Sequence, residues 1–219
     1  MPPVPDPLRM FLVVRRGAIA TIARGGELAG AAAVACVRTF RDDERFGPEL
    51  DAWRPRPGKV TLRARGGQWP QLLAEEPHVV AGDPDGEAVV ALPPRRRSER
   101  GPLLERLQAM TTALEPPPER AGTAPGRVTY VVNPRLEMSS GKTLAQIAHA
   151  AVMAAEDGAL RDWVAVGCPA TVVAPAQAAF DALCTSDGLA AKVVDAGLTE
   201  VAPGTVTVLA LPPGADLGG

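Results

Sequence analysis

Three polar side chains occupy one face of a predicted helix. Lys142, Gln146 and His149 are spaced i, i+4, i+7 in an alanine-rich segment, so all three would face the same way. Lys142 would stand in the first turn, where a cation opposes the helix dipole. It is also one of only three lysines beside 20 arginines. The spacing alone fits a solvated helix face, whereas the position and rarity of Lys142 favour a site that needs a compact ammonium group.

A second candidate is Asp195, together with Thr199 four residues later. Asp195 directly follows the predicted strand over 192–194 and precedes Gly197, so it would stand at the carboxyl end of that strand, where α/β sheets bind their ligands. Such a carboxylate can act as a general base or orient a water molecule. The alternative is an Asx-turn that caps the strand.

The segments around these residues alternate between strands and helices. Ser139 and Ser140 offer N-cap side chains for an uninterrupted helix over 142–155. Other runs predict strands at 128–132, 170–173, 192–194 and 206–211, and a second helix at 175–184. This pattern predicts a layered α/β domain of about 90–100 residues.

A proline- and glycine-rich stretch precedes this domain. The apolar spacing over 102–114 predicts a helix that the prolines at 116–118 end, and 121–126 reads as a flexible linker. We therefore divide the chain into a first domain over 1–94, a helix and linker over 95–126, and a second domain over 127–219.

The first domain repeats short motifs of the second in the same order. Phe11–Val13 matches Tyr130–Val132, and Ala91–Pro94 matches Ala210–Pro213. The sequence therefore predicts two tandem copies of a small layered α/β domain, each with a mixed four-stranded sheet flanked by helices.

Composition restricts the function classes further. The net charge of −2 argues against nucleic-acid binding by the whole surface, although the chain up to residue 120 carries +2 and the remainder −4. Three cysteines do not make a disulfide framework, and the sequence shows neither a secretory signal nor a run of about 18 apolar residues. We expect a cytoplasmic protein without membrane contact.

Taken together, two segments resemble the type 2 peptidyl-tRNA hydrolase family. Met138–Ala150, MSSGKTLAQIAHA, is similar to the family's M-G-K-G-K-x-A-A-Q-x-x-H-A, and Asp195–Leu209, DAGLTEVAPGTVTVL, to its D-A-G-R-T-Q-I-A-P-G-S-x-T-V-L. The resemblance covers about 127–213. It implies hydrolysis of the ester between a peptide and the 3′ ribose of tRNA, without metal or cofactor.

The resemblance also implies roles for individual residues. The catalytic positions fall on Lys142, Asp195 and Thr199, and the substrate-binding positions on Gln146, His149, Ser140 and Gly141. Lys142 would stabilise the oxyanion or hold a phosphate, while Asp195 and Thr199 would activate or hold water. His149 would be either a general base or a histidine that is packed for structure.

This sequence departs from the family pattern at three positions. Ser140 and Leu198 replace a lysine and an arginine, and Glu200 replaces a glutamine. Lost cations weaken the binding of a polyanion, so either tRNA affinity is lower or other cations compensate.

The first domain is a candidate source of those cations. It lacks the site residues, since the counterparts of Lys142, Gln146 and His149 are Gly26, Gly30 and Ala33. It is rich in arginines, which either contact phosphates or serve as solubilising surface: Arg15, Arg16, Arg54, Arg56, Arg63 and Arg65. Such a degenerate copy could take the place of a partner subunit, which would make a pseudo-dimer within one chain.

The first hypothesis is therefore an esterase that recycles peptidyl-tRNA. The alternative is a non-catalytic tRNA- or partner-binding protein that kept the fold. A third option is an esterase that acts on another small molecule or on a modified tRNA, since a fold does not fix a function.

Overall fold

The computed structural model describes residues 6–120, 125–197 and 200–215. The first part of the chain forms strands β1 (Arg9–Arg15), β2 (Gly58–Ala64), β3 (Val79–Gly82), β4 (Ala88–Arg95) and β5 (Gln108–Ala109), with helices α1 (Ile22–Thr39), α2 (Gly47–Trp53), α3 (Gln68–Glu75) and α4 (Pro102–Arg106). The second part forms β6 (Val128–Val132), β7 (Ala170–Val173), β8 (Ala191–Val194) and β9 (Val206–Leu211), with α5 (Ser140–Ala155), α6 (Arg161–Ala165) and α7 (Gln177–Leu183). Short 3₁₀ turns lie at Arg97–Glu99 and Gly158–Leu160.

The two sheets share one topology. The first has the order β3-β4-β1-β2-β5 and the second the order β7-β6-β9-β8. In each, the first strand pairs in parallel with the second strand and antiparallel with the fourth, which is β4 in the first sheet and β9 in the second. A tryptophan also recurs at the same place, because Trp53 Nε1 donates to Gly58 O and Trp163 Nε1 to Pro169 O, each at 2.8 Å. The predicted α/β class with mixed sheets is confirmed, and the common topology supports the predicted duplication.

One detail of the predicted fold is wrong, because the first sheet has five strands. The helix expected over 102–114 ends at Arg106, and β5 pairs with β2 through Leu62 opposite Ala109. The N–H of Met110 continues this pairing by donating to Thr61 O at 3.0 Å. The free edge of β2 thus provides backbone partners that outweigh helical propensity.

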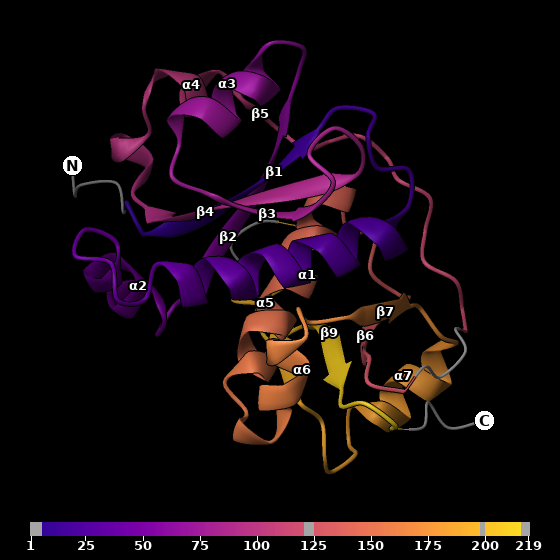
Figure 1. Ribbon diagram of the computed structural model, residues 1–219. Coiled ribbons are helices and arrows are strands. Elements are labelled where there is room, and N and C mark those ends of the chain that lie inside the picture. The colour runs from indigo at the N-terminus through magenta and orange to yellow at the C-terminus, as the bar shows by residue number, and fades with distance from the viewer. Residues whose placement is uncertain (1–5, 121–124, 198–199, 216–219) are drawn as a thin grey trace, which may run out of the picture.

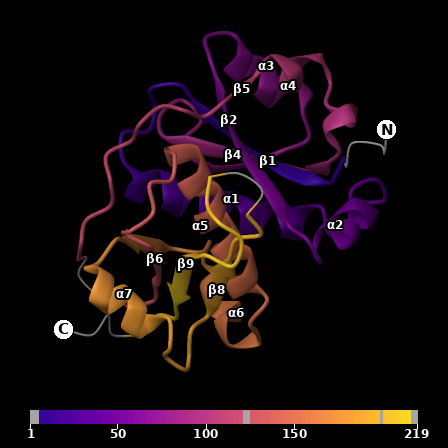
Figure 2. The same cartoon turned by 180° about the vertical axis from the view of Figure 1, so that it is seen from behind.

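The helices α1 and α5 lie between the two sheets (Figures 1 and 2). Outside this centre, α3 and α4 cover the outer face of the first sheet, where Trp69, Leu72 and Leu104 are buried. Likewise, α7 covers the outer face of the second sheet through Phe180 and Leu183. One apolar cluster extends through the centre, and it includes Met10 and Leu12 of β1, Ala33 of α1, Ile147 of α5 and Val172 of β7.

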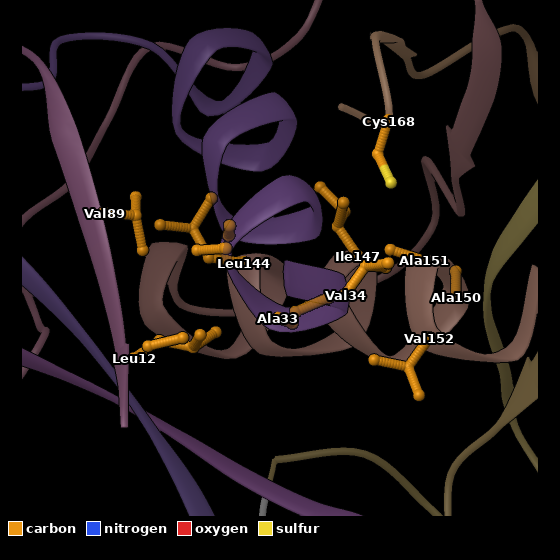
Figure 3. Close-up of a cluster of buried hydrophobic side chains, with 14 of the residues drawn as sticks. Leu12, Ala33, Val34, Val89, Leu144, Ile147, Ala150, Ala151, Val152 and Cys168 are labelled. Atoms are coloured by element: carbon orange, nitrogen blue, oxygen red, sulfur yellow. The ribbon is translucent and has the colours of Figure 1, made fainter. Parts of the chain in front are cut away.

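Glycines bring α1 close to the second half of the molecule. A Cβ atom at Gly26 would lie 2.7 Å from Ile147 Cδ1, and one at Gly30 would lie 3.0 Å from the Tyr130 hydroxyl and 3.2 Å from Ala151 Cβ. The tight layer is visible in Figure 3, where Leu144, Ile147 and Ala151 of α5 lie against α1. Each glycine in a helix interior costs up to about 1 kcal/mol relative to alanine. The structure offsets this cost with close packing.

The linker is attached to both halves. Ile22 N donates to Glu115 O at 2.8 Å, and Glu115 N to Ala20 O at 2.9 Å. Further along, Ala174 N donates to Pro118 O at 2.9 Å. The backbone over 114–118 is therefore held in place, whereas 121–124, part of the predicted flexible linker, lies outside the described residues. Among the described helices, none combines the length and the apolar character needed to cross a membrane.

The close packing at Gly30 predicts a stability defect. We expect Gly30→Val to lower the free energy of unfolding by about 1–3 kcal/mol, because its side chain would collide with Ala151 and Tyr130. Urea denaturation measures this. Gly67→Val is the matched control, since nothing lies within 4 Å of a Cβ there and the backbone has φ −65°. Equal stability of the two variants would contradict the packing argument.

Candidate active site

The helix α5 carries the predicted polar face. It begins at Ser140 with Ser139 as the N-cap, whose Oγ accepts the N–H of Lys142 at 3.2 Å. Lys142 and His149 are half-buried, and Gln146 is only 7% exposed. The alternative of a solvated helix face is therefore wrong, because this face is turned into the protein.

Asp195 joins this face from the end of β8. Its Oδ2 atom lies 2.6 Å from Lys142 Nζ and also accepts a hydrogen bond from Gln146 Nε2. Its Oδ1 atom accepts the backbone N–H of Gly197 at 2.7 Å. The structure thus brings together two motifs that lie about fifty residues apart in the sequence. The Gly197 bond is also the predicted Asx-turn, so one carboxylate serves the turn and the cluster together.

The surroundings of Asp195 favour its ionised form. Burial by itself would raise the pKa of this carboxyl group, but hydrogen bonds from Lys142, Gly197 and Gln146, together with the Lys142 charge, outweigh it and lower the pKa. Asp195 is therefore a carboxylate at neutral pH and a weak proton acceptor. The fixed carboxylate of Asp195 is suited to accept a hydrogen bond and so to orient the group that donates it.

Thr207 contacts the cluster through Gln146 and is not among the predicted site residues. Its side chain on β9 is fully buried, and its hydroxyl donates to Gln146 Oε1 at 3.2 Å. This contact fixes which end of the Gln146 amide faces Asp195. Thr207 is the only polar residue of its strand, VTVLAL, and that is the signal by which the sequence could have revealed it.

His149 lies one turn beyond Gln146. Among the described residues, its imidazole makes no hydrogen bond within the protein. Burial lowers its pKa to about 3, and the charges of Lys59 and Lys142 act in the same direction against that of Asp195. The ring is consequently uncharged at neutral pH, which disfavours a general base and suits a hydrogen-bonding group.

The N-terminal end of α5 holds the remaining predicted residues. Glu200 accepts hydrogen bonds from the N–H and hydroxyl of Ser139 at 2.7 and 2.8 Å. The Ser140 hydroxyl accepts the N–H of Leu114 at 2.9 Å, and Gly141 lies so close to Met110 that a Cβ atom would be 2.5 Å from its carbonyl oxygen. Ser140 and Gly141 thus contact the linker, and their substrate-binding role stays a prediction.

Thr199, the third predicted catalytic residue, lies outside the described residues, as does Leu198. Within the described part of the chain, no group of three or more His, Cys, Asp or Glu side chains is arranged to hold a metal ion.

Comparison with known proteins adds independent information on the second half. Residues 127–217 match the family model described as Peptidyl-tRNA hydrolase PTH2. The proteins named "Peptidyl-tRNA hydrolase 2, mitochondrial" of Bos taurus and Homo sapiens are each 39% identical over 103 residues. These alignments cover 42% of this chain and 58% of each relative, so the chain spans little more than half the length of the curated relatives it matches. No solved structure matches the chain.

The depressed pKa of Asp195 predicts a dependence of stability on pH. The ionised carboxylate contributes stability above the unfolded-state pKa of about 3.9, and this contribution is lost as pH falls through the lower folded-state pKa. We therefore expect the stability advantage of the wild type over Asp195→Asn to shrink below about pH 4. Urea unfolding of both proteins between pH 3 and pH 7 tests this, and a difference that does not change with pH would refute it.

Proposed function

We propose that this chain, whose residues 127–217 belong to the peptidyl-tRNA hydrolase PTH2 family, hydrolyses the ester that joins a peptide or an N-blocked amino acid to tRNA. The observation that carries the proposal is the cluster of Lys142, Gln146 and Asp195, which pairs a cation with an ionised carboxylate in a largely buried setting. Ester hydrolysis can use both charges, because a cation stabilises the oxyanion and a carboxylate orients the attacking water.

Lys142 is suited to the developing negative charge. When water attacks the ester carbonyl carbon, the carbonyl oxygen becomes an oxyanion, and a fixed cation in a partly desolvated site stabilises that charge. The Lys142 side chain is only 14% exposed and is held by Asp195. It is therefore in place before the reaction begins.

Asp195 is suited to position the attacking water. A carboxylate has roughly four lone-pair sites, and the described residues donate to three of them through Lys142, Gln146 and Gly197. The remaining site can accept a hydrogen bond from water. After the attack, the tetrahedral intermediate expels the ribose 3′ oxygen, which takes up one proton of the attacking water. The other proton of that water passes to solvent as the new carboxyl group ionises, so the peptide leaves as a carboxylate.

The other predicted residues serve the substrate in this proposal. His149 offers an uncharged imidazole next to Gln146, which fits a hydrogen bond to ribose or peptide. Thr199 would hold the water together with Asp195. Thr207 acts indirectly, because it orients the Gln146 amide.

Glu200 favours the second candidate, a protein that binds tRNA without turning it over. Its carboxylate is fixed at the N-terminus of α5, close to where a polyanionic substrate must approach Lys142. An anion at this end of a helix satisfies the groups that would otherwise attract a phosphate. The proposal of catalysis therefore requires a direct assay.

The central prediction concerns release of the peptide. The purified protein is expected to release the acyl group from N-blocked aminoacyl-tRNA, and Asp195→Ala and Lys142→Met are each expected to lower kcat by about two orders of magnitude or more. Single-turnover hydrolysis of labelled substrate measures this.

Asp187→Asn is the matched control, since Asp187 is an exposed carboxylate of the same half and its loss should leave the rate unchanged. Absence of release at high protein concentration, with tRNA still bound, would reject hydrolysis and favour the binding protein.

A further prediction concerns Glu200. Replacing it by glutamine removes one negative charge and keeps an acceptor for Ser139. We expect Glu200→Gln to bind tRNA more tightly by about 1 kcal/mol, or roughly fivefold, at low salt, with the gain fading as salt screens the charge. Binding titrations at several salt concentrations test this, and unchanged affinity at low salt would contradict it.

A further inference from the structure

The inner face of β2 carries an arginine near its carboxyl end that the proposed reaction has not used so far. Arg63 is opposite Val14 of β1, and Val14 belongs to the central cluster together with Ile147 of α5. Residues that are paired across neighbouring strands point to the same face of a sheet. The Arg63 Nε atom is buried and has no hydrogen-bond partner among the described residues. Since an unpaired buried N–H lowers stability, packing alone does not explain an arginine at this position.

The outer end of this side chain is held beside a second arginine. Arg63 Nη2 donates to Gln108 Oε1 at 3.0 Å, and Arg65 Nη2 donates to the same oxygen atom. Gln108 is the residue opposite Arg63 on β5, and both Gln108 and Arg65 are exposed to solvent. One neutral amide thus brings two guanidinium groups together at the surface of the protein.

The two guanidinium groups have no acidic partner in the part of the chain that the structure describes, where neither forms an ion pair. Two like charges held side by side repel each other, and an anion between them relieves that repulsion. Each guanidinium group also has more N–H donors than its bonds within the protein use. Phosphate is the anion that the paired donors of arginine match best in geometry.

The segment that follows β5 connects this arginine pair to the candidate active site. The Thr112 hydroxyl accepts a hydrogen bond from Arg63 Nη1 at 3.2 Å. Thr112 lies in the middle of residues 110–114, and both ends of that segment contact the first turn of α5. The same turn carries Lys142. The first half therefore holds Arg63 close to the end of the helix at which the substrate must approach Lys142.

We propose that Arg63 and Arg65 form a phosphate-binding site for the 3′-terminal single strand of tRNA, which the first half contributes to the active site of the second half. The identity of this ligand rests on the proposed function, because an ester bound at Lys142 brings the last phosphates of the strand to the first turn of α5. The pair offers two cations in a sequence that lacks the lysine and the arginine of the family pattern at positions 140 and 198.

The test compares two exposed arginines at opposite ends of β2. Arg65 directly follows the strand and Arg56 lies two residues before it, so Arg65→Gln and Arg56→Gln remove the same charge from the same half. We expect Arg65→Gln to weaken binding of deacylated tRNA about fivefold at low salt. The dependence of log Kd on log salt concentration should become shallower by about 0.7, the value for one phosphate contact to a single strand. Arg56→Gln should bind like the wild type.

A trimmed tRNA locates the contact. Removal of the unpaired 3′-terminal nucleotides should abolish the difference in affinity between Arg65→Gln and the wild type. Equal affinity of Arg65→Gln and Arg56→Gln for intact tRNA would overturn the proposal and leave both arginines as solubilising surface. A difference of the same size on trimmed tRNA would also overturn it.

Gln108→Glu is a second variant, and it keeps both arginines. Its carboxylate pairs with the two guanidinium groups and so competes with a phosphate for them. We expect this variant to bind tRNA about fivefold more weakly or worse, while its resistance to urea is unchanged or higher. Wild-type affinity of Gln108→Glu for tRNA would contradict the proposal.

Binding and hydrolysis together separate this site from the proposed function. In the hydrolysis assay, we expect Arg65→Gln to raise KM about fivefold with kcat little changed, because the arginine pair does not contact the reacting ester. If tRNA binding responds as expected and no protein of the set hydrolyses substrate, the proposed function fails and the phosphate site stands. If the wild type hydrolyses substrate and Arg65→Gln behaves like Arg56→Gln, the phosphate site fails and the proposed function stands.

Discussion

The close approach of α1 to the second half of the molecule is the constraint on which the rest of the structure depends. Gly26 and Gly30 leave no room for a Cβ atom between α1 and its neighbours Ile147, Tyr130 and Ala151. Because α1 and α5 lie between the sheets (Figure 1), one apolar cluster serves both halves. Neither half buries its inner sheet face without the other. The two similar topologies therefore form one packed unit, and the predicted counterparts of the site residues in the first half, Gly26, Gly30 and Ala33, lie in this packed centre.

This arrangement explains the character of the site. A helix that is covered on several sides cannot leave its polar face to water, so each polar group on it needs a partner inside the protein. The partners are Asp195 for Lys142 and Gln146, and Thr207 for the far end of the Gln146 amide. His149 avoids the cost of a buried charge in another way, because its imidazole ring stays uncharged. A compact ammonium group fits between carboxylate and helix where the planar fork of an arginine would need more acceptors, which gives a reason for a lysine here in an arginine-rich chain.

Much of the second half could be predicted from the sequence, because its signals are local. The N-cap at Ser139 and the alanine-rich run define α5, and the β-branched runs define β6, β7 and β9 to within a residue or two. The helix expected over 102–114 was wrong because the pairing of β5 with the edge of β2 is non-local. Thr207 and Lys59 went unassigned for the same reason. The surroundings of a threonine or a lysine in a strand depend on the helix that the fold packs against that strand, and the local sequence does not show which helix that is.

The distribution of charge follows from the same geometry. The chain up to residue 120, whose helix α1 has none of the predicted site residues, carries a net charge of +2, whereas the remainder, which contains the candidate site, carries −4. Where α5 meets β2, Lys59 lies opposite Met10 of the central cluster, and its ammonium group lies 4.5 Å from the centre of the Trp53 indole ring. This face of β2 carries Lys59, Thr61 and Arg63, opposite Met10, Leu12 and Val14 of β1. A first half that merely covered α5 would need only apolar residues here, so the polar character of this face is a feature that packing alone does not explain.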